Sequence, residues 1–317
     1  MWHLMVDLAR LHKEFINEQR FATRLSEVTL RGYEQSFTLL LEVMPELTTD
    51  QVTSGTVTEF FRRLETRTRM VGRGIKKVGV KKSTIVTYRS KLNRFFQWLE
   101  NKKYIRKNPF SMMEYPDVRY EDRKFLSRQD IQKIFTALAL GLVQQDAFIQ
   151  RRNLAIFATL LYTGIRKGEL LGLQVTDLDL QRRELTVRAE TSKSRLRRII
   201  PISSELMKLL RDYLSERIRR KLTTPFIFAS SAHDDRLSAD GLKHLTETVQ
   251  RTSGVKFHLH QLRHTFAVNM LNNGSDIAKL KQLLGHRDIR MTASYLRCLP
   301  TSVMRGDVET LTLDNLV

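Results

Sequence analysis

The spacing of hydrophobic residues predicts helices through the first third of the chain. Apolar positions recur three and four residues apart in segments 4–15, 30–43 and 57–64. This is the period of a helix that buries one face and leaves the other to solvent. The three segments therefore predict a small helical bundle at the start of the chain.

Segment 71–79, which follows the third of these helices, contains three glycines and three basic residues. This composition predicts a mobile loop, which is either a binding loop or a plain connector. Ser83 is placed to cap a fourth helix that runs to about Glu100, and Asn108-Pro109 predicts where that helix stops.

The stretch 114–124 contains Pro116 and seven charged residues, a composition typical of an interdomain linker, although an ordinary surface loop can share it. After it, Ser127 and Asp130 form a helix-start signal close to a capping box. The boundaries that follow are a first domain at 1–115, a linker at 116–124, a second domain at 125–300 and a tail at 301–317.

The second domain changes its pattern twice. Helical spacing continues to about Leu173, and then 185–188 and 198–200 alternate like two strands joined through a turn at Lys193. Helical spacing returns afterwards, with a turn predicted at Asn273-Gly274. The fold class that these patterns predict is mainly α with a small β-sheet.

Charge adds a class of partner to this picture. The chain has 317 residues and carries 54 Lys and Arg against 34 Asp and Glu, a formal net charge of +20. Sixteen of the basic residues, but only Glu65 and Glu100 among the acidic ones, lie between Arg62 and Lys107. The first domain should therefore present a basic outer face, and such a surface suits a polyanion, with double-stranded DNA as the expected partner.

Several other classes of protein are disfavoured. The single cysteine, Cys298, excludes an intramolecular disulfide and fits a reducing compartment. The longest apolar run, 154–162, is too short to span a bilayer, and Asp7 and Arg10 interrupt the apolar N-terminal stretch, unlike a signal peptide. We therefore expect a soluble cytoplasmic protein with no membrane partner.

The second domain also contains six polar residues that suit transfer of a DNA phosphodiester without a metal: Arg166, Lys193, His260, Arg263, His286 and Tyr295. A phosphodiester under attack gathers charge on its non-bridging oxygens, and the guanidiniums of Arg166 and Arg263 offer paired donors to that charge. Tyr295 supplies a nucleophile, but a phenol with a pKa near ~10 needs a base or cationic surroundings at neutral pH. Either His260 or His286 can be that base, because imidazole titrates close to neutrality.

Each of these residues also has an ordinary interpretation. His258, His260, His264 and His286 could bind zinc, but no cysteine lies among them and Asp276 is the only acid between them. We therefore expect no metal and no other cofactor.

Two further assignments have competing interpretations. Lys193 shares its turn with Arg195, Arg197 and Arg198, so this basic hairpin can simply hold phosphate. Glu169 either orients the arginines or is a helix-surface charge. The interpretation of the site as catalytic therefore depends on all six residues occurring together.

The segments that carry these residues resemble the tyrosine recombinases, the family of phage integrases, Xer-type chromosome resolvases and transposon recombinases. In that family an Arg follows Thr-Gly by two residues and precedes a Glu by three, as Arg166 does in Thr163-Gly-Ile-Arg166 before Glu169. Lys193 lies eight residues before a Pro, as the family's hairpin Lys does. The other matches are His260-x-x-Arg263, Leu284-Gly-His286 and Tyr295, nine residues after His286. The resemblance spans roughly 125–300.

The resemblance implies a role for each residue. His260 is then the base, His286 hydrogen-bonds the phosphate, Lys193 protonates the leaving 5′-oxygen and Glu169 orients the arginine cluster. It also implies a two-domain C-shaped clamp around duplex DNA, a helical core-type DNA-binding domain before the catalytic domain, and a 3′-phosphotyrosyl intermediate. A homo-tetramer on two DNA sites would exchange strands through a Holliday junction, and the tail 301–317 could pass to a neighbouring protomer.

The sequence therefore predicts a site-specific DNA recombinase for integration, excision or resolution, of a mobile element or a chromosome. Strand swivelling like that of a type IB topoisomerase and a catalytically idle DNA-binding accessory protein are the alternatives. The candidate DNA contacts are Arg73, Lys76, Lys77, Lys81, Lys82, Arg89, Arg195 and Arg197.

Overall fold

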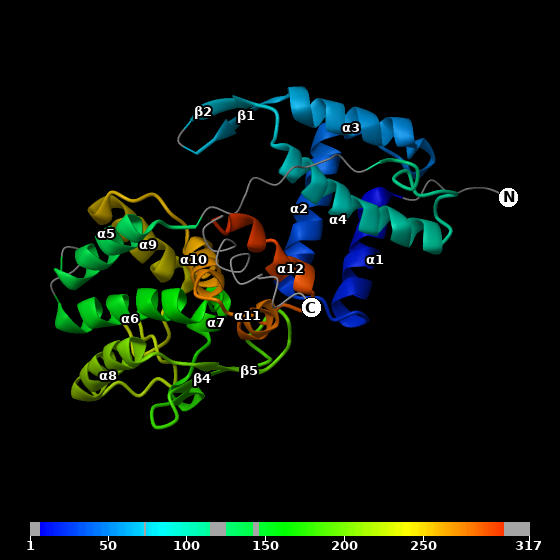
Figure 1. Cartoon of the computed structure of the whole chain (residues 1–317). Coiled ribbons are helices and arrows are strands. Elements are labelled where there is room, and N and C mark those ends of the chain that lie inside the picture. The colour runs from blue at the N-terminus through cyan, green and yellow to red at the C-terminus, as the bar shows by residue number, and fades with distance from the viewer. Residues whose placement is uncertain (1–6, 73, 115–124, 142–145, 301–317) are drawn as a thin grey trace, which may run out of the picture. The chain divides into compact units, whose positions relative to one another are not determined.

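The computed structural model describes residues 7–72, 74–114, 125–141 and 146–300 (Figure 1). The chain divides into two compact units, Met1–Arg119 and Tyr120–Val317, which are described separately below. The predicted linker 116–124 and the predicted tail 301–317 lie outside the described residues.

The described part of unit 1 is a bundle of four α-helices around an aromatic core. Phe95 and Phe96 on the fourth helix are almost completely buried, and Phe15 and Phe37 from the first two helices pack on Phe95. The helices are α1 (Leu8–Phe21), α2 (Glu27–Val43), α3 (Ser54–Thr66) and α4 (Lys82–Asn101), with the 3₁₀ turn η1 (Thr49–Gln51) before α3.

These four helices confirm the pattern expected from the sequence, with two shifts at the ends of α4. The helix begins one residue before Ser83, after Lys81, so Ser83 is not its cap. It ends at Asn101 rather than at Asn108, whose side chain is buried and accepts a hydrogen bond from the backbone N–H of Phe110 at 3.0 Å. Asn108 therefore shapes a separate turn after the helix.

The segment predicted as a mobile loop is instead a β-hairpin. Strands β1 (Thr68–Val71) and β2 (Ile75–Val78) pair antiparallel, with Thr68 opposite Val78 and Met70 opposite Lys76. We call the two strands β1 and β2 together the ribbon. Gly79 anchors its base, because it has a positive φ of 67° and an added Cβ would lie 2.5 Å from the carbonyl oxygen of Glu65.

Unit 2 is built on α6 (Ala147–Thr163), which is buried along most of its length and packs against α8 (Ser204–Arg219) and α10 (Leu259–Asn272) (Figure 1). A three-stranded antiparallel sheet has the order β3-β4-β5. The remaining elements are α5 (Arg128–Ala139), α7 (Lys167–Leu171), η2 (Val175–Asp177), β3 (Leu178–Asp179), β4 (Glu184–Val187), β5 (Arg198–Pro201), α9 (Ala239–Ser253), α11 (Ile277–Leu284), α12 (Ile289–Ala293) and η3 (Leu296–Cys298).

Several local predictions for this unit are confirmed. Ser127 and Asp130 form the capping box of α5, and β4 pairs with β5 around the turn that contains Lys193. Gly274, with a φ of 76°, lies in the turn between α10 and α11. The short strand β3 was not predicted, since two residues are too few to show an alternating pattern.

A small separate core fixes the end of the described chain. Phe266 and Leu271 of α10 pack with Leu280 and Leu284 of α11, and Tyr295 is fully buried among them. This cluster holds the segment after α11 against α10. No helix in the described ranges is long and apolar enough to cross a membrane.

A buried histidine makes the stability of unit 1 depend on pH. The ring of His12 stacks on Phe37 with centroids 4.0 Å apart, and burial lowers the pKa of His12 to about 4 from 6.5. The unfolded chain therefore binds the extra proton between pH 6.5 and 4, so this contribution to stability is complete above pH 6.5 and declines as the pH falls toward 4.

We predict that His12→Phe, which keeps an aromatic ring but cannot take up a proton, removes this pH dependence. Wild type should lose roughly 3 kcal/mol of unfolding free energy more than the variant between pH 7.5 and 4. Urea unfolding followed by the fluorescence of Trp98, in a Trp2→Phe background, measures the difference. Equal losses in the two chains would contradict the prediction.

Candidate active site

The turn between α6 and α7 places Arg166 and Glu169 on one short segment. Gly164 ends α6 with a φ of 62°, and a Cβ there would lie 2.4 Å from the ring of Phe266. Arg166 is the N-cap residue of α7, and its backbone N–H donates to Oε2 of Glu169 at 2.8 Å. The first turn of α7 thus fixes the carboxylate of Glu169 next to Arg166.

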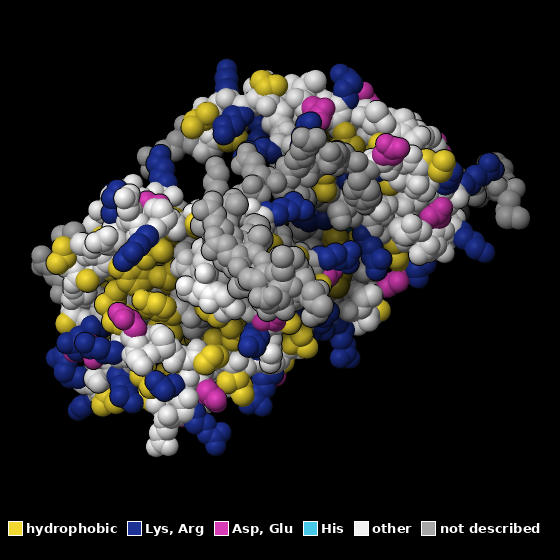
Figure 2. Space-filling model, in the orientation of Figure 1, with side chains coloured by type: hydrophobic (Ala, Val, Ile, Leu, Met, Phe, Trp, Pro, Cys, Tyr) yellow, Lys and Arg dark blue, Asp and Glu magenta, His cyan; other side chains and the backbone are white. Residues whose placement is uncertain are grey.

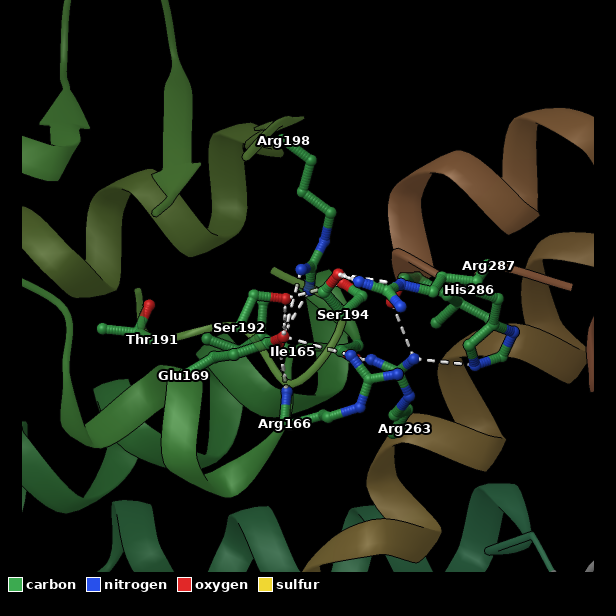
Figure 3. Close-up of polar contacts among 12 residues, drawn as sticks. Ile165, Arg166, Glu169, Thr191, Ser192, Ser194, Arg198, Arg263, His286 and Arg287 are labelled. Atoms are coloured by element: carbon green, nitrogen blue, oxygen red, sulfur yellow. Dashed lines mark hydrogen bonds and ion pairs between the residues drawn. The ribbon is translucent and has the colours of Figure 1, made fainter. Parts of the chain in front are cut away.

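Glu169 is a buried carboxylate that joins two guanidiniums (Figure 3). Arg198, from β5, donates to its two oxygens at 3.1 and 2.7 Å, and Nη1 of Arg166 donates to Oε1 at 3.1 Å. Burial alone would raise the pKa of Glu169, but the hydrogen bonds and positive charges of Arg198 and Arg166 lower it to about 2. The carboxylate is therefore ionised at neutral pH and holds both cations in place.

Arg263 is fully buried on α10, yet its charge is compensated by the ends of two helices. It donates to the carbonyl oxygens of Gly164 at 2.6 Å and Leu284 at 2.8 Å, at the C-terminal ends of α6 and α11. Such carbonyls carry the negative end of the helix dipole. Burial, followed by the charge of Arg166, lowers the pKa of Arg263 to about 9, so the guanidinium remains protonated at neutral pH.

The contacts of His286 indicate its tautomer. Nη2 of Arg263 lies 2.9 Å from Nε2 of His286, and Nδ1 of the same ring lies 2.9 Å from the hydroxyl of Thr292. Because a guanidinium only donates, Nε2 accepts this hydrogen bond and Nδ1 carries the proton. His286 is thus a neutral ring beside Arg263, fixed by the first turn of α12.

Tyr295 also packs against α10, with its hydroxyl 2.9 Å from Nδ1 of His264. The rings of His264 and His260 meet edge to face with centroids 4.4 Å apart, and His260 is exposed. The hydroxyl, His264 and His260 therefore form a continuous row from the buried core to the surface. Tyr295 also acts electrostatically on Arg263, the residue next to His264.

The turn between β4 and β5 presents Lys193 at the surface between two buried serines. Ser192 donates to Oε1 of Glu169 at 3.1 Å, and the carbonyl oxygen of Ser194 accepts from Nε and Nη2 of Arg287 at 3.0 and 2.8 Å. These contacts tie the turn to Glu169 on one side and to the segment after α11 on the other. Lys193 is thereby held on an anchored turn, while its amine remains exposed.

Gly285 lies directly against the guanidinium of Arg198. It ends α11 with a φ of 63°, and an added Cβ would lie 2.9 Å from Nη1 of Arg198. Arg198 also donates through Nε to the carbonyl oxygen of Leu283 at 2.8 Å. The arginine that holds Glu169 is thus packed against the glycine that precedes His286.

The structure brings Arg166, Arg263 and His286 into one connected network through Glu169 and backbone carbonyls. Tyr295 is held beside this network by α10. The ring of His260 contacts the ring of His264, which is hydrogen-bonded to the Tyr295 hydroxyl. Lys193 is joined to it through its neighbours in the turn. Among the described residues, no group of three or more His, Cys, Asp or Glu side chains is arranged to hold a metal.

Sequence reasoning missed the residues that support this network. Arg198 was counted only among the charges of a basic turn, although it is buried and pairs with Glu169. His264 was considered only as a zinc ligand, although its spacing of four residues from His260 places it on the same side of α10. No sequence signal pointed to Thr292 or Arg287.

The candidate DNA contacts fall into three groups. The prediction that Arg89 contacts DNA is corrected. Its guanidinium is buried and donates to the backbone carbonyls of Met113 and Glu114 instead of facing solvent. Arg73 lies outside the described residues. The exposed candidates are Lys76, Lys77, Lys81, Lys82, Arg195 and Arg197.

Comparison with known proteins decides the family. Residues 122–301 match the model of the phage integrase family, and residues 13–103 match the phage integrase N-terminal SAM-like domain. The chain belongs to the phage integrase family. This recombinase is 32% identical over 224 residues to the tyrosine recombinase XerC of Bacillus licheniformis, covering 68% of this chain and 71% of the relative. It is 29% identical to XerC of Thermodesulfovibrio yellowstonii, covering 89% of each chain.

Solved structures share the fold. The integrase of the transposon Tn1549, in complex with transposon right end DNA, has a TM-score of 0.73 at 20% identity, covering 96% of this chain and 99% of that one. A lambda integrase dimer bound to a COC′ core site has a TM-score of 0.70 at 17% identity, covering 92% and 95%. The match to the phage integrase family and the XerC relatives make this chain a tyrosine-type site-specific recombinase, and its fold is mainly helical with small sheets.

We predict that Glu169→Gln destabilises unit 2 by roughly 3–5 kcal/mol at pH 7, because it leaves two guanidiniums without their buried carboxylate. Since the folded pKa of Glu169 is about 2 and the ordinary value is 4.5, the wild-type advantage is complete above pH 4.5 and declines only as the pH falls toward 2. Chemical unfolding measures the difference in unfolding free energy between wild type and the variant. Glu247→Gln, in an exposed pair with Lys243, is the control, and equal stability of the two variants would contradict the prediction.

Proposed function

We propose that this recombinase cuts and rejoins duplex DNA at specific sites through a covalent 3′-phosphotyrosyl link to Tyr295. The observation that carries the proposal is the network in which Arg166, Arg263 and His286 are fixed beside one another by Glu169 and by carbonyls at helix ends. Two guanidiniums that can donate to one phosphate are thereby held in position before a substrate arrives, and His286 is fixed beside them. Such preorganisation is where most electrostatic stabilisation of a transition state originates.

The proposed chemistry balances without an external energy source. The Tyr295 oxygen bonds to the scissile phosphorus as the bond to the 5′-oxygen breaks, so one phosphodiester replaces another. The phenolic proton passes to a histidine, and His260 is our candidate for the base. The leaving 5′-oxygen takes a proton from Lys193, and a 5′-hydroxyl then reverses the reaction to rejoin the strand.

The position of Tyr295 supports one further step in the proposed mechanism. The Tyr295 hydroxyl is buried and hydrogen-bonded to His264, so it must leave this contact to reach a phosphate. The segment that carries it, from His286 to Cys298, consists of two short helical turns. We propose that binding of DNA releases this segment, which presents the phenol to Arg166 and Arg263.

The DNA partner is supported by charge and by relatives. The chain has a formal net charge of +20, and similar folds include a XerH recombinase bound to difH substrate as well as the Tn1549 and lambda complexes. Each chain offers one Tyr295, whereas exchange between two duplexes requires four strand cuts. We therefore propose a homo-tetramer on two sites, with strand exchange through a Holliday junction.

Tyr295→Phe should retain DNA binding within about twofold of wild type but form no covalent adduct, because the substitution removes only the attacking oxygen. The substrate is a duplex recovered from a random-sequence library by its binding to this protein, with a nick that traps the cleaved state. Denaturing gels detect the adduct. Tyr162→Phe, at a half-exposed tyrosine on α6, is the control and should form the adduct normally. An adduct in Tyr295→Phe at the wild-type level would refute the assignment.

Arg166→Lys should slow formation of the adduct about 10²–10³-fold, because the ammonium keeps the charge but lacks the paired donors of a guanidinium. DNA binding should change little. Single-turnover cleavage of the same nicked duplex measures the rate, with Arg128→Lys at an exposed position of α5 as the matched control. A loss below about fivefold would exclude Arg166 from the phosphate clamp.

A further inference from the structure

The ribbon in unit 1 projects from the end of α3 with little apolar packing of its own (Figure 1). Met70, Ile75 and Val78 are 61%, 58% and 71% exposed. A two-stranded hairpin of this length is marginally stable in water without a packed face, and large apolar side chains are rarely left exposed together without a binding role. The ribbon therefore has the composition of a surface that meets a partner.

The base of the ribbon is nevertheless built rigidly. The N–H of Gly79 donates to the carbonyl oxygen of Arg67 at 2.9 Å, and Nε of Arg69 donates to the carbonyl oxygen of Gly79 at 2.8 Å. The close approach of Gly79 to Glu65 locks the base to the last turn of α3. The ribbon thus leaves the bundle in a direction set by the fold, not as a free loop.

The two faces of the ribbon differ. Residues directly opposite each other in an antiparallel pair point to the same side, so Thr68, Met70, Lys76 and Val78 share what we call the front face. All four are exposed. The back face carries Arg69, Val71, Ile75 and Lys77, of which Arg69 and Val71 are half-buried and Arg69 is bonded to the base.

The charge around the ribbon indicates the chemical class of its partner. No acidic residue occurs between Glu65 and Glu100, while Lys76, Lys77, Lys81 and Lys82 are all exposed. At the place that Figure 1 gives to β1 and β2, Figure 2 shows hydrophobic and basic side chains together on the surface. A purely cationic surround repels a basic protein surface and attracts a phosphate backbone.

We propose that the ribbon enters the major groove of duplex DNA, with its front face against the base edges and its flanking lysines on the phosphates. The major groove is wide enough to admit a two-stranded ribbon. Met70 and Val78 can contact thymine methyl groups there, and Lys76 can donate to guanine. This proposal depends on the proposed function only for the nature of the substrate, and it makes the ribbon a determinant of sequence specificity separate from the catalytic residues.

Two matched double variants test the face that is used. The front-face variant combines Met70→Ala with Lys76→Ala, and the back-face variant combines Ile75→Ala with Lys77→Ala. Each removes one large apolar side chain and one lysine, so the loss of charge is the same. The back-face variant loses the greater strand propensity because Ile75 is β-branched, so weaker binding by the front-face variant cannot be attributed to a weaker strand. The Tyr295→Phe chain is the background, so cleavage does not affect the measurement.

Both variants are assayed on the duplex recovered by the parent chain from a random-sequence library, and each is also used to recover duplexes of its own. The front-face variant should bind the parent duplex roughly tenfold more weakly and recover a consensus that has lost defined positions. The back-face variant should bind within about threefold and recover the full consensus. Equal losses with unchanged consensus in both would overturn the proposal.

A thiol-protection measurement covers the case in which the double variants disturb the hairpin itself. In a Cys298→Ser background, Met70→Cys should be protected from maleimide by the bound duplex, whereas Ile75→Cys should react as fast as without DNA. The proposal would be overturned if DNA left the maleimide reactivity of Met70→Cys unchanged. It would also be overturned if this reactivity fell on raising the protein concentration in the absence of DNA. Failure of the tyrosine chemistry would appear separately, as a missing adduct in the wild-type chain.

Discussion

The site depends on a single buried carboxylate between two guanidiniums. Both carboxylate oxygens of Glu169 accept hydrogen bonds from the guanidinium of Arg198. They also accept hydrogen bonds from the backbone N–H and the guanidinium of Arg166. A buried carboxylate is costly unless it is paired and hydrogen-bonded, and here the pairing fixes the end of α6, the start of α7 and strand β5 relative to one another. The same pairing leaves the remaining donors of Arg166 in a defined position, which is what a clamp for phosphate requires.

The second arginine of the proposed clamp is held by a different principle. Arg263 has no carboxylate partner among the hydrogen bonds of its guanidinium described above; backbone carbonyls at the ends of α6 and α11 and the ring of His286 receive its donors. The negative ends of the two helix dipoles offset its burial. Arg166 and Arg263 thus lie on elements far apart in the chain, and the packing of α6, α10 and α11 decides their separation.

Much of the fold, and several of the residues that the fold brings together at the candidate site, could be predicted from the sequence, because periodicity, caps and motif spacing are local signals. The helices of unit 1, the capping box at Ser127 and the hairpin around Lys193 are of this kind. The ribbon was misjudged because its strands are short and its glycines suggested a loop. Arg89 looked like a surface cation, and only the tertiary fold shows that it caps carbonyls of the segment after α4.

The supporting residues could not be found in this way because their roles exist only after folding. Nothing local distinguishes Arg198 from Arg197, yet one is buried against Glu169 and the other is exposed. His264 likewise becomes relevant only when the end of the chain returns to α10 and places a hydroxyl beside it. Such residues are defined by contacts between distant segments, which spacing cannot report.

Gly285 shows how tightly neighbouring parts of the site are coupled. Its lack of a side chain leaves room for the guanidinium of Arg198, and its left-handed backbone turns the chain so that the next residue meets Arg263. Position 285 therefore has almost no freedom to vary on its own: even a methyl group there would disturb the carboxylate anchor and the imidazole together. During divergence of such a chain, position 285 should remain fixed while surface positions drift.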